Sequence, residues 1–441
     1  MFSNKDITRL MIPLIVEQAL AVTIGLADTV MVAYVGETVV SGVSIVDAIN
    51  MLLVQVFAAL ATGGAIVVAQ YLGRQDKSAA CEAAKQLFLV MGAIGVAVAA
   101  ICVTWRLGIL RLVYHTVEPA VMESAQEYFY LTGLSFPFFA IYNAGAALFR
   151  SQGNSRISML TALMMNILNI GGNAIFLFGY NMGARAVGLG TLIARVVGAA
   201  VMLYLIRDSR NRVYVDRILP LHFRPKMVGT ILRIGVPTGL ENGMFHFGKL
   251  MVSGLVASFG TVAITANAVG NSIASTACIP GSAVGLGMIT IVGQCIGAGE
   301  YDQARRYIKK LMKLAYIVGG ATNILAVLFM KQLVGFFSLS PQTAHLAIVI
   351  SSMHAGFWVL FWPAAFTLPN GLRAAGDVKF TMVVSVAVMW VCRIGLSYVL
   401  ALYFNLGLVG VWLAMIFDWV VRAAFYIVRF MGSKWHSHTV I

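Results

Sequence analysis

Long apolar segments recur along the whole chain, and short polar stretches separate them. A helix of about 20 residues crosses the roughly 30 Å of hydrocarbon in a bilayer, and these segments reach that length. Their sequences lack the alternation of apolar and polar positions that a membrane barrel needs, so the pattern predicts helices. The twelve predicted spans lie near residues 9–35, 42–72, 86–110, 124–149, 156–180, 187–206, 230–259, 263–296, 308–330, 344–372, 380–404 and 407–431.

The first part of this pattern is repeated in the second half of the chain. Residues 9–80 match residues 233–304, weakly but in register, and LFRSQGN at 148–154 recurs as GLRAAGD at 371–377. The matched positions include Arg9 with Arg233, Pro13 with Pro237, Glu17 with Glu241 and Arg150 with Arg373. Repeats of this length indicate that one ancestral unit is used twice.

The spans and the repeat together predict an all-α integral membrane protein with twelve transmembrane helices in two pseudo-symmetric six-helix lobes. Two copies in the same orientation are related by a pseudo-twofold axis along the membrane normal, and a shared site lies between such halves. We expect an N-lobe at residues 1–206, a basic cytoplasmic linker at 207–229 and a C-lobe at 230–441.

Composition and charge support a membrane location. Apolar residues make up 60% of the chain and charged residues 11%, with a mean hydropathy of +0.86, whereas soluble domains have about 45–50% and about 25%. Most lysines and arginines fall on one side of the predicted spans; the other side has only Arg106, Arg111, Arg185 and Lys331. We therefore expect an inner (plasma) membrane protein with both termini in the cytoplasm. The net charge of +14 sets topology and meets membrane lipids, and it does not indicate nucleic-acid binding.

Four polar residues inside the predicted spans are candidates for a cation or proton site. A carboxylate at the centre of a membrane helix costs about 2.5–3.5 kcal/mol on insertion scales, so it is seldom kept without a function. Asp28 is therefore our first choice. Asn166, Asn169 and Asn173 share one helical face in the fifth span. These amides either join neighbouring helices or help to solvate a cation at Asp28. We favour the functional interpretation, because no basic residue lies within two turns of Asp28 on its own helix.

Other charged residues in the spans have two open interpretations. Glu17 and Glu241 occupy matching positions, so they either form symmetric contacts at a lobe interface or gate, or they bind substrate. Lys249 lies two turns after Glu241 and requires a partner. Asp418 and Arg422 are spaced to neutralise each other. The basic residues Arg195, Lys249 and Arg393 look too scattered to form one site.

Sequence patterns argue against enzymatic chemistry and cofactors. The five cysteines form no CxxC pair, so neither a disulfide framework nor a zinc site is indicated. GMFHFGKL at 243–250 matches the first part of a P-loop, but Leu250 stands where a magnesium-binding Ser or Thr is needed. We expect no cofactor, no direct use of ATP and no certain metal site.

Six motifs give the chain a specific resemblance. They are ADTVMVAYVG at 27–36, VAQYLGRQD at 68–76, LFRSQGN at 148–154, NIGGNAIFLFG at 169–179, AVGLGTLIA at 186–194 and GLRAAGD at 371–377. In order and spacing they resemble motifs of the multidrug and toxic compound extrusion family, in particular its DinF-like and related bacterial branches. The resemblance implies a monomeric antiporter that expels amphipathic, often cationic drugs by alternating access of two lobes, while H⁺ or Na⁺ flows in.

The resemblance also implies roles for individual residues. The family's cation site in the amino lobe combines an aspartate with an asparagine and an acid, which fall on Asp28, Asn169 and Asn173. Because Asn173 replaces the acid, proton coupling fits better than sodium, although amide oxygens leave room for Na⁺ at these three residues. In the carboxyl lobe, relatives have a carboxylate where this chain has Phe245, and Glu241 is a displaced substitute. The candidates for the substrate cavity are Glu17, Met31, Tyr142, Glu241, Phe245 and Lys249.

Two alternatives to an antiporter stay open. A flippase for lipid-linked saccharides of the same superfamily needs a cavity rich in basic residues for its pyrophosphate. A membrane-embedded enzyme needs a nucleophile or a metal cluster, and motifs such as HExxH and GxSxG are missing from the sequence.

Overall fold

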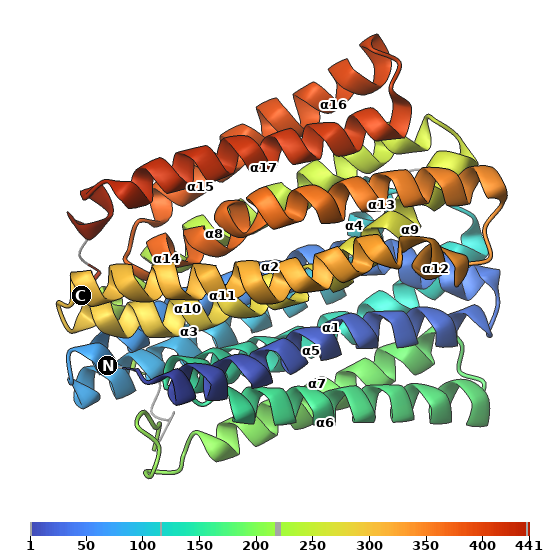
Figure 1. Cartoon of the computed structure of the whole chain (residues 1–441). Helices are drawn as coiled ribbons and strands as arrows, with labels where there is room; N and C mark the ends of the chain where they lie inside the picture. Colours follow the sequence, from blue (N-terminus) through green and yellow to red (C-terminus); the bar gives the residue numbers. More distant parts are fainter. Residues whose placement is uncertain (1, 115–116, 217–221, 438–439) are drawn as a thin grey trace. The chain divides into compact units, whose positions relative to one another are not determined.

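The computed structural model describes residues 2–114, 117–216, 222–437 and 440–441, and all regular elements within them are helices (Figure 1). The first half contains α1 (Asn4–Ala33), α2 (Glu37–Gly73), α3 (Lys77–Thr104), α4 (Arg106–Val113), α5 (Pro119–Ser151), α6 (Ser155–Ala174), the π-helix η1 (Ile175–Gly179) and α7 (Ala184–Leu205). The predicted all-α class is confirmed.

The second half begins with the long helix α8 (Pro225–Ala257) and contains four further π-helical or 3₁₀ segments. Its elements after α8 are α9 (Thr261–Ala277), α10 (Ile279–Gly297), α11 (Tyr301–Leu328), α12 (Met330–Gly335), α13 (Pro341–Trp362), η2 (Pro363–Thr367), α14 (Leu368–Ala374), α15 (Val378–Val388), η3 (Met389–Gly395), α16 (Leu396–Tyr398), η4 (Val399–Tyr403), α17 (Gly407–Met431) and η5 (Lys434–Ser437).

Eleven helices of the described chain are long and apolar enough to cross a membrane. α8 covers the predicted span at 230–259 as far as Ala257, and this helix of 33 residues carries Arg233, Glu241 and Lys249 within the span. Together these helices account for the twelve predicted spans.

Two predicted spans differ from the observed helices for identifiable reasons. α3 begins at Lys77, well before the predicted residue 86, because the side chain of Asp76 accepts a hydrogen bond from the backbone of Ala79 and caps the helix. The predicted span 263–296 is not continuous but divides at Cys278 into α9 and α10. Pro280 stands in the first turn of α10, where its missing N–H is tolerated. Its ring would clash within a continuous helix, so α9 ends before it.

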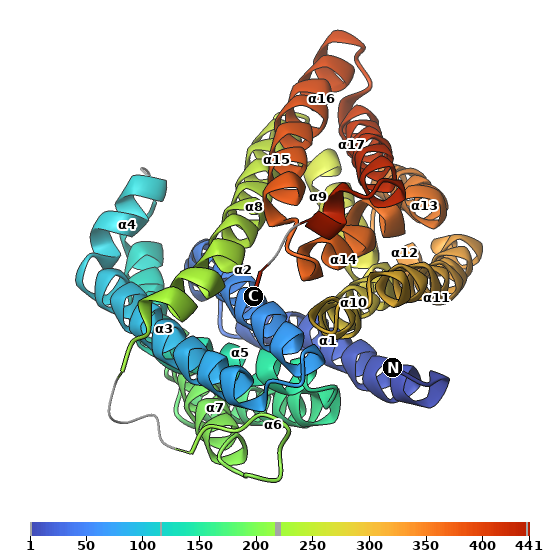
Figure 2. The same cartoon turned by 90° about the vertical axis from the view of Figure 1, so that its left-hand side faces the viewer.

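The chain divides into two compact units, Phe2–Gly239 and Leu240–Ile441, and the boundary falls within α8. In the first unit, α5 lies against α2, α3 and α7, while α6 packs on α1 and α7 (Figure 2). Small residues permit these close approaches: a methyl group built at Gly95 of α3 would lie 2.8 Å from the Cα atom of Pro137 in α5. The packing fixes α1, α6 and α7 as neighbours, and these three helices carry most of the polar candidates.

The connector between α7 and α8 is held by polar contacts with α3. The side chain of Gln86 donates to the carbonyl of His222 (2.7 Å) and accepts from the backbone N–H of Arg224 (3.0 Å). Residues 225–229 of the predicted linker are helical, because α8 begins at Pro225. Its residues 217–221 lie outside the described part of the chain.

The second unit is organised around α13, α17 and α10. α13 contacts α9, α11 and α17, and α10 contacts α11 and α14. The ring of Trp358 lies within 2.0 Å of a methyl group built at Gly319, so only glycine lets α11 pack on α13 at this point. η3 and η4 both pack on α17. Such π-helical segments change which face of a helix its side chains occupy, and they are frequent at functional sites.

Candidate functional site

A chain of hydrogen bonds links Asp28 on α1 through α6 to α7. The side-chain amide of Asn173 donates to the carboxylate of Asp28 (2.8 Å) and to the side-chain oxygen Oδ1 of Asn169 (3.2 Å). Asn169 in turn donates to the hydroxyl of Thr191 (3.0 Å). Asn169 and Asn173 are buried, whereas Asp28 is half-buried. The structure therefore brings together three of the four predicted cation-site residues.

Asn166, the fourth, lies apart from this chain. Its amide donates to the backbone carbonyl of Leu20 (2.9 Å) and so joins α6 to α1 at another level. Asn166 shares a helical face with Asn169 and Asn173, but seven residues of helix separate it from Asn173 by about 10 Å along the axis. Met31, three residues after Asp28, is half-buried on α1.

Close packing fixes the orientation of the Asn173 amide. A methyl group built at Gly190 of α7 would lie only 2.0 Å from Oδ1 of Asn173. The amide oxygen therefore points at the α7 backbone, and the NH₂ group faces Asp28. This oxygen has no hydrogen-bond partner in the described chain. As arranged, Asp28 has a donor beside it and not a second oxygen ligand.

A second carboxylate, Asp47 on α2, belongs to the same region and was missed in the sequence. Its Oδ1 accepts a hydrogen bond from the hydroxyl of Tyr128 (2.8 Å). Asp47 lies close enough to Asp28 for their charges to interact, and Arg195 on α7 interacts with both. Arg195 donates to the hydroxyl of Ser135 (2.7 Å). The signal was present, because Asp47 interrupts the second predicted span, where a carboxylate is as costly as Asp28.

Glu17 is held inside the first unit by a buried ion pair. Its Oε1 lies 2.6 Å from a guanidinium nitrogen of Arg150 on α5, and its Oε2 accepts a hydrogen bond from Ser158 on α6 (2.6 Å). Tyr142 is half-buried on α5 and lies within electrostatic range of Glu17. Glu17 thus joins three helices of one unit.

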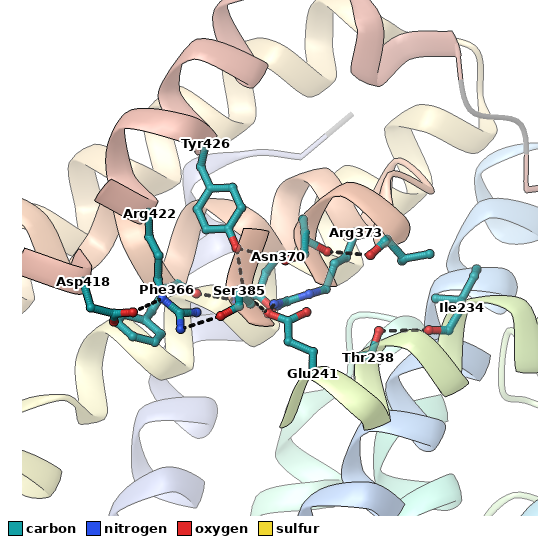
Figure 3. Close-up of polar contacts among 12 residues, drawn as sticks. Ile234, Thr238, Glu241, Phe366, Asn370, Arg373, Ser385, Asp418, Arg422 and Tyr426 are labelled. Atoms are coloured by element: carbon teal, nitrogen blue, oxygen red, sulfur yellow. Dashed lines mark hydrogen bonds and ion pairs between the residues drawn. The ribbon is translucent and has the colours of Figure 1, made fainter. Parts of the chain in front are cut away.

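Glu241 is held in the same way in the second unit (Figure 3). Its Oε1 lies 2.6 Å from Arg373 on α14 and accepts a hydrogen bond from Ser385 on α15. Ser385 also shares a hydrogen bond with the hydroxyl of Tyr426 on α17 (2.8 Å). Each half therefore contains the same buried group of glutamate, arginine and serine, which we call the Glu–Arg–Ser group.

A second set of charges in the Leu240–Ile441 unit surrounds Phe245 on α8. Arg393 of η3 lies 5.1 Å from the centre of its ring, and Lys249 lies 5.9 Å from it. The expectation that Lys249 and Arg393 are scattered is wrong, because α8 and η3 meet at Phe245. Arg195, the third basic residue that we expected to be scattered, belongs to the Phe2–Gly239 unit and not to this set.

Asp418 provides the carboxylate of this second set. It forms the predicted ion pair with Arg422 (3.0 Å) and lies 3.8 Å from Arg393. Arg422 also stands 5.7 Å from the centre of the Phe245 ring. Across the described chain, no group of three or more His, Cys, Asp or Glu residues could hold a metal ion.

Comparisons with known proteins agree with this architecture. The family model MatE matches the chain twice, at residues 13–175 and 237–399. The uncharacterized transporter YisQ of Bacillus subtilis (strain 168) is 27% identical over 434 residues, which cover 96% of this chain and 93% of YisQ. The probable multidrug resistance protein NorM of Thermotoga maritima is 25% identical over 443 residues, covering 99% and 94%.

The fold is also that of solved transporters. A crystal structure of MATE in complex with MaL6 superposes with a TM-score of 0.91 at 20% identity and covers 98% of this chain and 97% of that one. The two matches of the family model begin at Pro13 and Pro237, the prolines aligned by the internal repeat.

Proposed function

The chain belongs to the MatE family of membrane transporters, and we propose that it exports amphipathic, often cationic organic compounds in exchange for a cation. The relative NorM of Thermotoga maritima is named a probable multidrug resistance protein, and it aligns over almost the whole of both chains. The duplicated helical units supply the two parts that an alternating-access transporter moves. The topology that fits export has both termini in the cytoplasm of a plasma-membrane protein, as the distribution of lysine and arginine predicts.

The coupling cation in this proposal is a proton, and Asp28 binds it. The observation that supports this choice is the hydrogen bond from the NH₂ group of Asn173 to Asp28. Sodium prefers several oxygen ligands, but the packing against Gly190 directs the Asn173 oxygen away from the carboxylate. A proton needs only the carboxylate itself. Asp47 and Arg195 complete the electrostatic surroundings of the site.

Proton binding at Asp28 changes the hydrogen bonds between α1 and α6. The charged carboxylate accepts from Asn173, and this charge-assisted bond is roughly twice as strong as a neutral one. Protonation on the outer side weakens the bond and removes a negative charge that attracts a cationic substrate, so the substrate is released. Loss of the proton toward the cytoplasm restores both. The cycle works because proton and substrate each favour a different conformation.

Transport into proteoliposomes under an imposed gradient tests this function. The wild-type protein and Asp28→Asn are reconstituted, and movement of a fluorescent organic cation is followed with a pH gradient or with a sodium gradient. We expect the pH gradient alone to drive transport in the wild type. Asp28→Asn should lose at least about tenfold of the rate, because a positioned acid or base contributes about 100-fold or more to a reaction that depends on its proton. Asp302→Asn, at an exposed acid on α11, is the matched control. Coupled transport that persists in Asp28→Asn would overturn the assignment, and a response to sodium alone would replace the proton.

A further inference from the structure

The charged residues around Phe245 have no role in the proposed proton cycle. We call Lys249, Arg393 and Arg422, together with the aromatic ring of Phe245, the basic cluster. The residues come from α8, η3 and α17 of the Leu240–Ile441 unit. Each of the three cations lies within 6 Å of the ring centre, the distance at which a ring face attracts a cation. The cluster joins an apolar surface to several hydrogen-bond donors.

The basic cluster has more positive charge than the surrounding acids offset. Asp418 is the acid that pairs with both Arg422 and Arg393. Glu241 is also within electrostatic range of Arg422, but it is already in a 2.6 Å ion pair with Arg373. Arginine stays charged in proteins, so two arginines share one carboxylate even before Lys249 is counted.

Burial makes this excess charge significant. Arg393 is 8% exposed, Arg422 is 2% exposed and Asp418 is fully buried. Ionisable residues within a membrane are rare and are normally paired with one another or with a ligand. Neighbouring histidines do not supply negative charge: His246 and His354 both lie within electrostatic range of Lys249. The charge balance therefore calls for an anion.

Arg393 and Lys249 have donors that no acceptor uses. Among the described residues, the Nη1 atom of Arg393 is buried without a hydrogen-bond partner, and its nearest carboxylate oxygen is 3.8 Å away. Lys249 forms no ion pair with the described residues, and its side chain is exposed. By contrast, Arg422 donates to Asp418 (3.0 Å) and to the carbonyl of Ser385 (3.0 Å). The cluster therefore contains a buried guanidinium donor on Arg393 and an ammonium group on Lys249 that the described residues leave unused.

We propose that the basic cluster binds the carboxylate of an amphipathic organic substrate whose aromatic or apolar body packs near Phe245. A guanidinium matches a carboxylate in shape and donates two parallel hydrogen bonds to it. The assignment as a substrate site rests on the proposed transport function. It extends the substrates from organic cations to zwitterionic and anionic compounds.

A matched pair of dyes tests the proposal by direct binding. Rhodamine B has a free carboxylate, and its ethyl ester has the same ring system without one. Binding of each dye to the purified full-length protein is measured by fluorescence anisotropy, for the wild type and for Arg393→Gln and Lys249→Gln. We expect the wild type to prefer the acid, and each variant to lose about tenfold of its affinity for the acid, since hydrogen bonds to charged groups contribute about 1.5–3 kcal/mol. Affinity for the ester should stay unchanged.

Control variants separate this result from misfolding and from failure of the transport proposal. Lys331→Gln, at an exposed lysine of α12, should keep the preference for the acid. Lys249→Gln gives an answer if Arg393→Gln does not fold, because the Lys249 side chain is exposed. Asp28→Asn should keep the preference for the acid over the ester, because the basic cluster is intact in this variant. If Asp28→Asn keeps coupled transport but the wild type prefers the acid, only the coupling proposal fails.

Equal wild-type affinity for the two dyes, or a preference that survives in both cluster variants, would overturn the proposal. A lipid phosphate has related chemistry, so the measurement is repeated in nanodiscs of phosphatidylcholine with and without phosphatidylglycerol. Rhodamine B binding that is independent of phosphatidylglycerol supports a substrate site. Loss of rhodamine B binding with phosphatidylglycerol in the wild type, but not in Lys249→Gln, would make a lipid the occupant and overturn the substrate assignment.

Discussion

The two halves of the chain share a buried framework but have opposite charges beside it. Both contain the Glu–Arg–Ser group, with an ion pair of 2.6 Å in each half. Beyond this group, the first half has two acids, Asp28 and Asp47, near one base, Arg195. In the second half, three bases meet around one acid, Asp418. Duplication therefore preserved the glutamate–arginine pair, while the net charge of the neighbouring residues differs in sign between the two halves.

Arg195 and Asp418, the residue of opposite charge in each set, occupy matching positions in the repeat. Asp418 follows Arg195 by 223 positions, which is also the spacing between Arg150 and Arg373 of the Glu–Arg–Ser groups. A base in the first copy of the helix thus corresponds to an acid in the second. The ion pairs of the framework could not change singly, because removing one partner leaves an unpaired buried charge.

The largest expected effect comes from breaking the shared framework. Arg150→Ala and Arg373→Ala each leave a buried glutamate without its partner, which costs about 3–5 kcal/mol. We expect both variants to unfold at clearly lower temperature than the wild type in the same detergent, and by similar amounts. The control is Arg185→Ala, because the pair between Arg185 and Glu127 is also 2.6 Å long but Arg185 is 61% exposed, and exposed pairs contribute about 0–1 kcal/mol. A marked loss in one half only would show that the two groups are not equivalent.

The next effect should appear only in the acidic site, which is the group of Asp28, Asp47, Asn169 and Asn173 in the first half. Gly190→Ala places a methyl group on the amide oxygen of Asn173, so the amide must turn and its hydrogen bond to Asp28 is lost. Overpacking of this kind costs about 1–3 kcal/mol. We expect a several-fold loss of transport driven by a pH gradient, while rhodamine B binding persists. Gly171→Ala is the control on α6, because a methyl group there meets nothing within 4 Å. Equal activity of the two variants would contradict the role of the Asn173 orientation.

A smaller effect should distinguish the two acids of the first half. Asp47→Asn keeps the shape of the side chain and removes a charge that interacts with Asp28. We expect the pH dependence of transport to shift while transport itself continues, since Asp28 remains. Tyr128→Phe removes the donor to Asp47 without changing any charge, so it should have less effect on that pH dependence. A complete loss of coupling in Asp47→Asn would make Asp47, and not Asp28, the principal proton carrier.

The smallest effect lies outside the membrane and has a pH dependence of known sign. Burial against Tyr301 and Trp435 lowers the pKa of His436, and the nearby Arg305 lowers it further. The folded protein therefore favours the neutral imidazole. The resulting stability is fully present above the unfolded pKa of about 6.5 and is lost as the pH falls through the window below it. His436→Gln should flatten the change in unfolding temperature over this window, and an unchanged slope would exclude His436 as its source.

The sequence predicted the helices and the acidic site better than the basic cluster. The length of an apolar segment locates a membrane span. Asp28 and the amides of α6 could be found because a polar side chain within an apolar segment is costly in lipid and is visible in the sequence of its own helix. Asp47 could have been found by the same rule. The helix start at Asp76 depends on a side-chain cap, which an average over apolar residues does not detect.

The remaining features depend on packing between distant segments. Arg150 reaches Glu17 across 133 residues of sequence, and Arg373 reaches Glu241 across 132. Lys249 and Arg393 meet only because α8 and η3 both pack around Phe245. The need for glycine at position 190 follows only from the position of Asn173 on the neighbouring helix. None of these contacts follows from local periodicity.

The central claim is that the acidic site binds the coupling proton and the basic cluster binds the substrate's carboxylate. Transport of rhodamine B and of its ethyl ester, measured side by side in proteoliposomes with an imposed pH gradient, tests it most directly. The account predicts that Asp28→Asn stops the transport of both dyes, whereas Lys249→Gln removes only the advantage of the acid over the ester. Coupled transport that continues in Asp28→Asn, or a Lys249→Gln variant that loses both dyes equally, would contradict it.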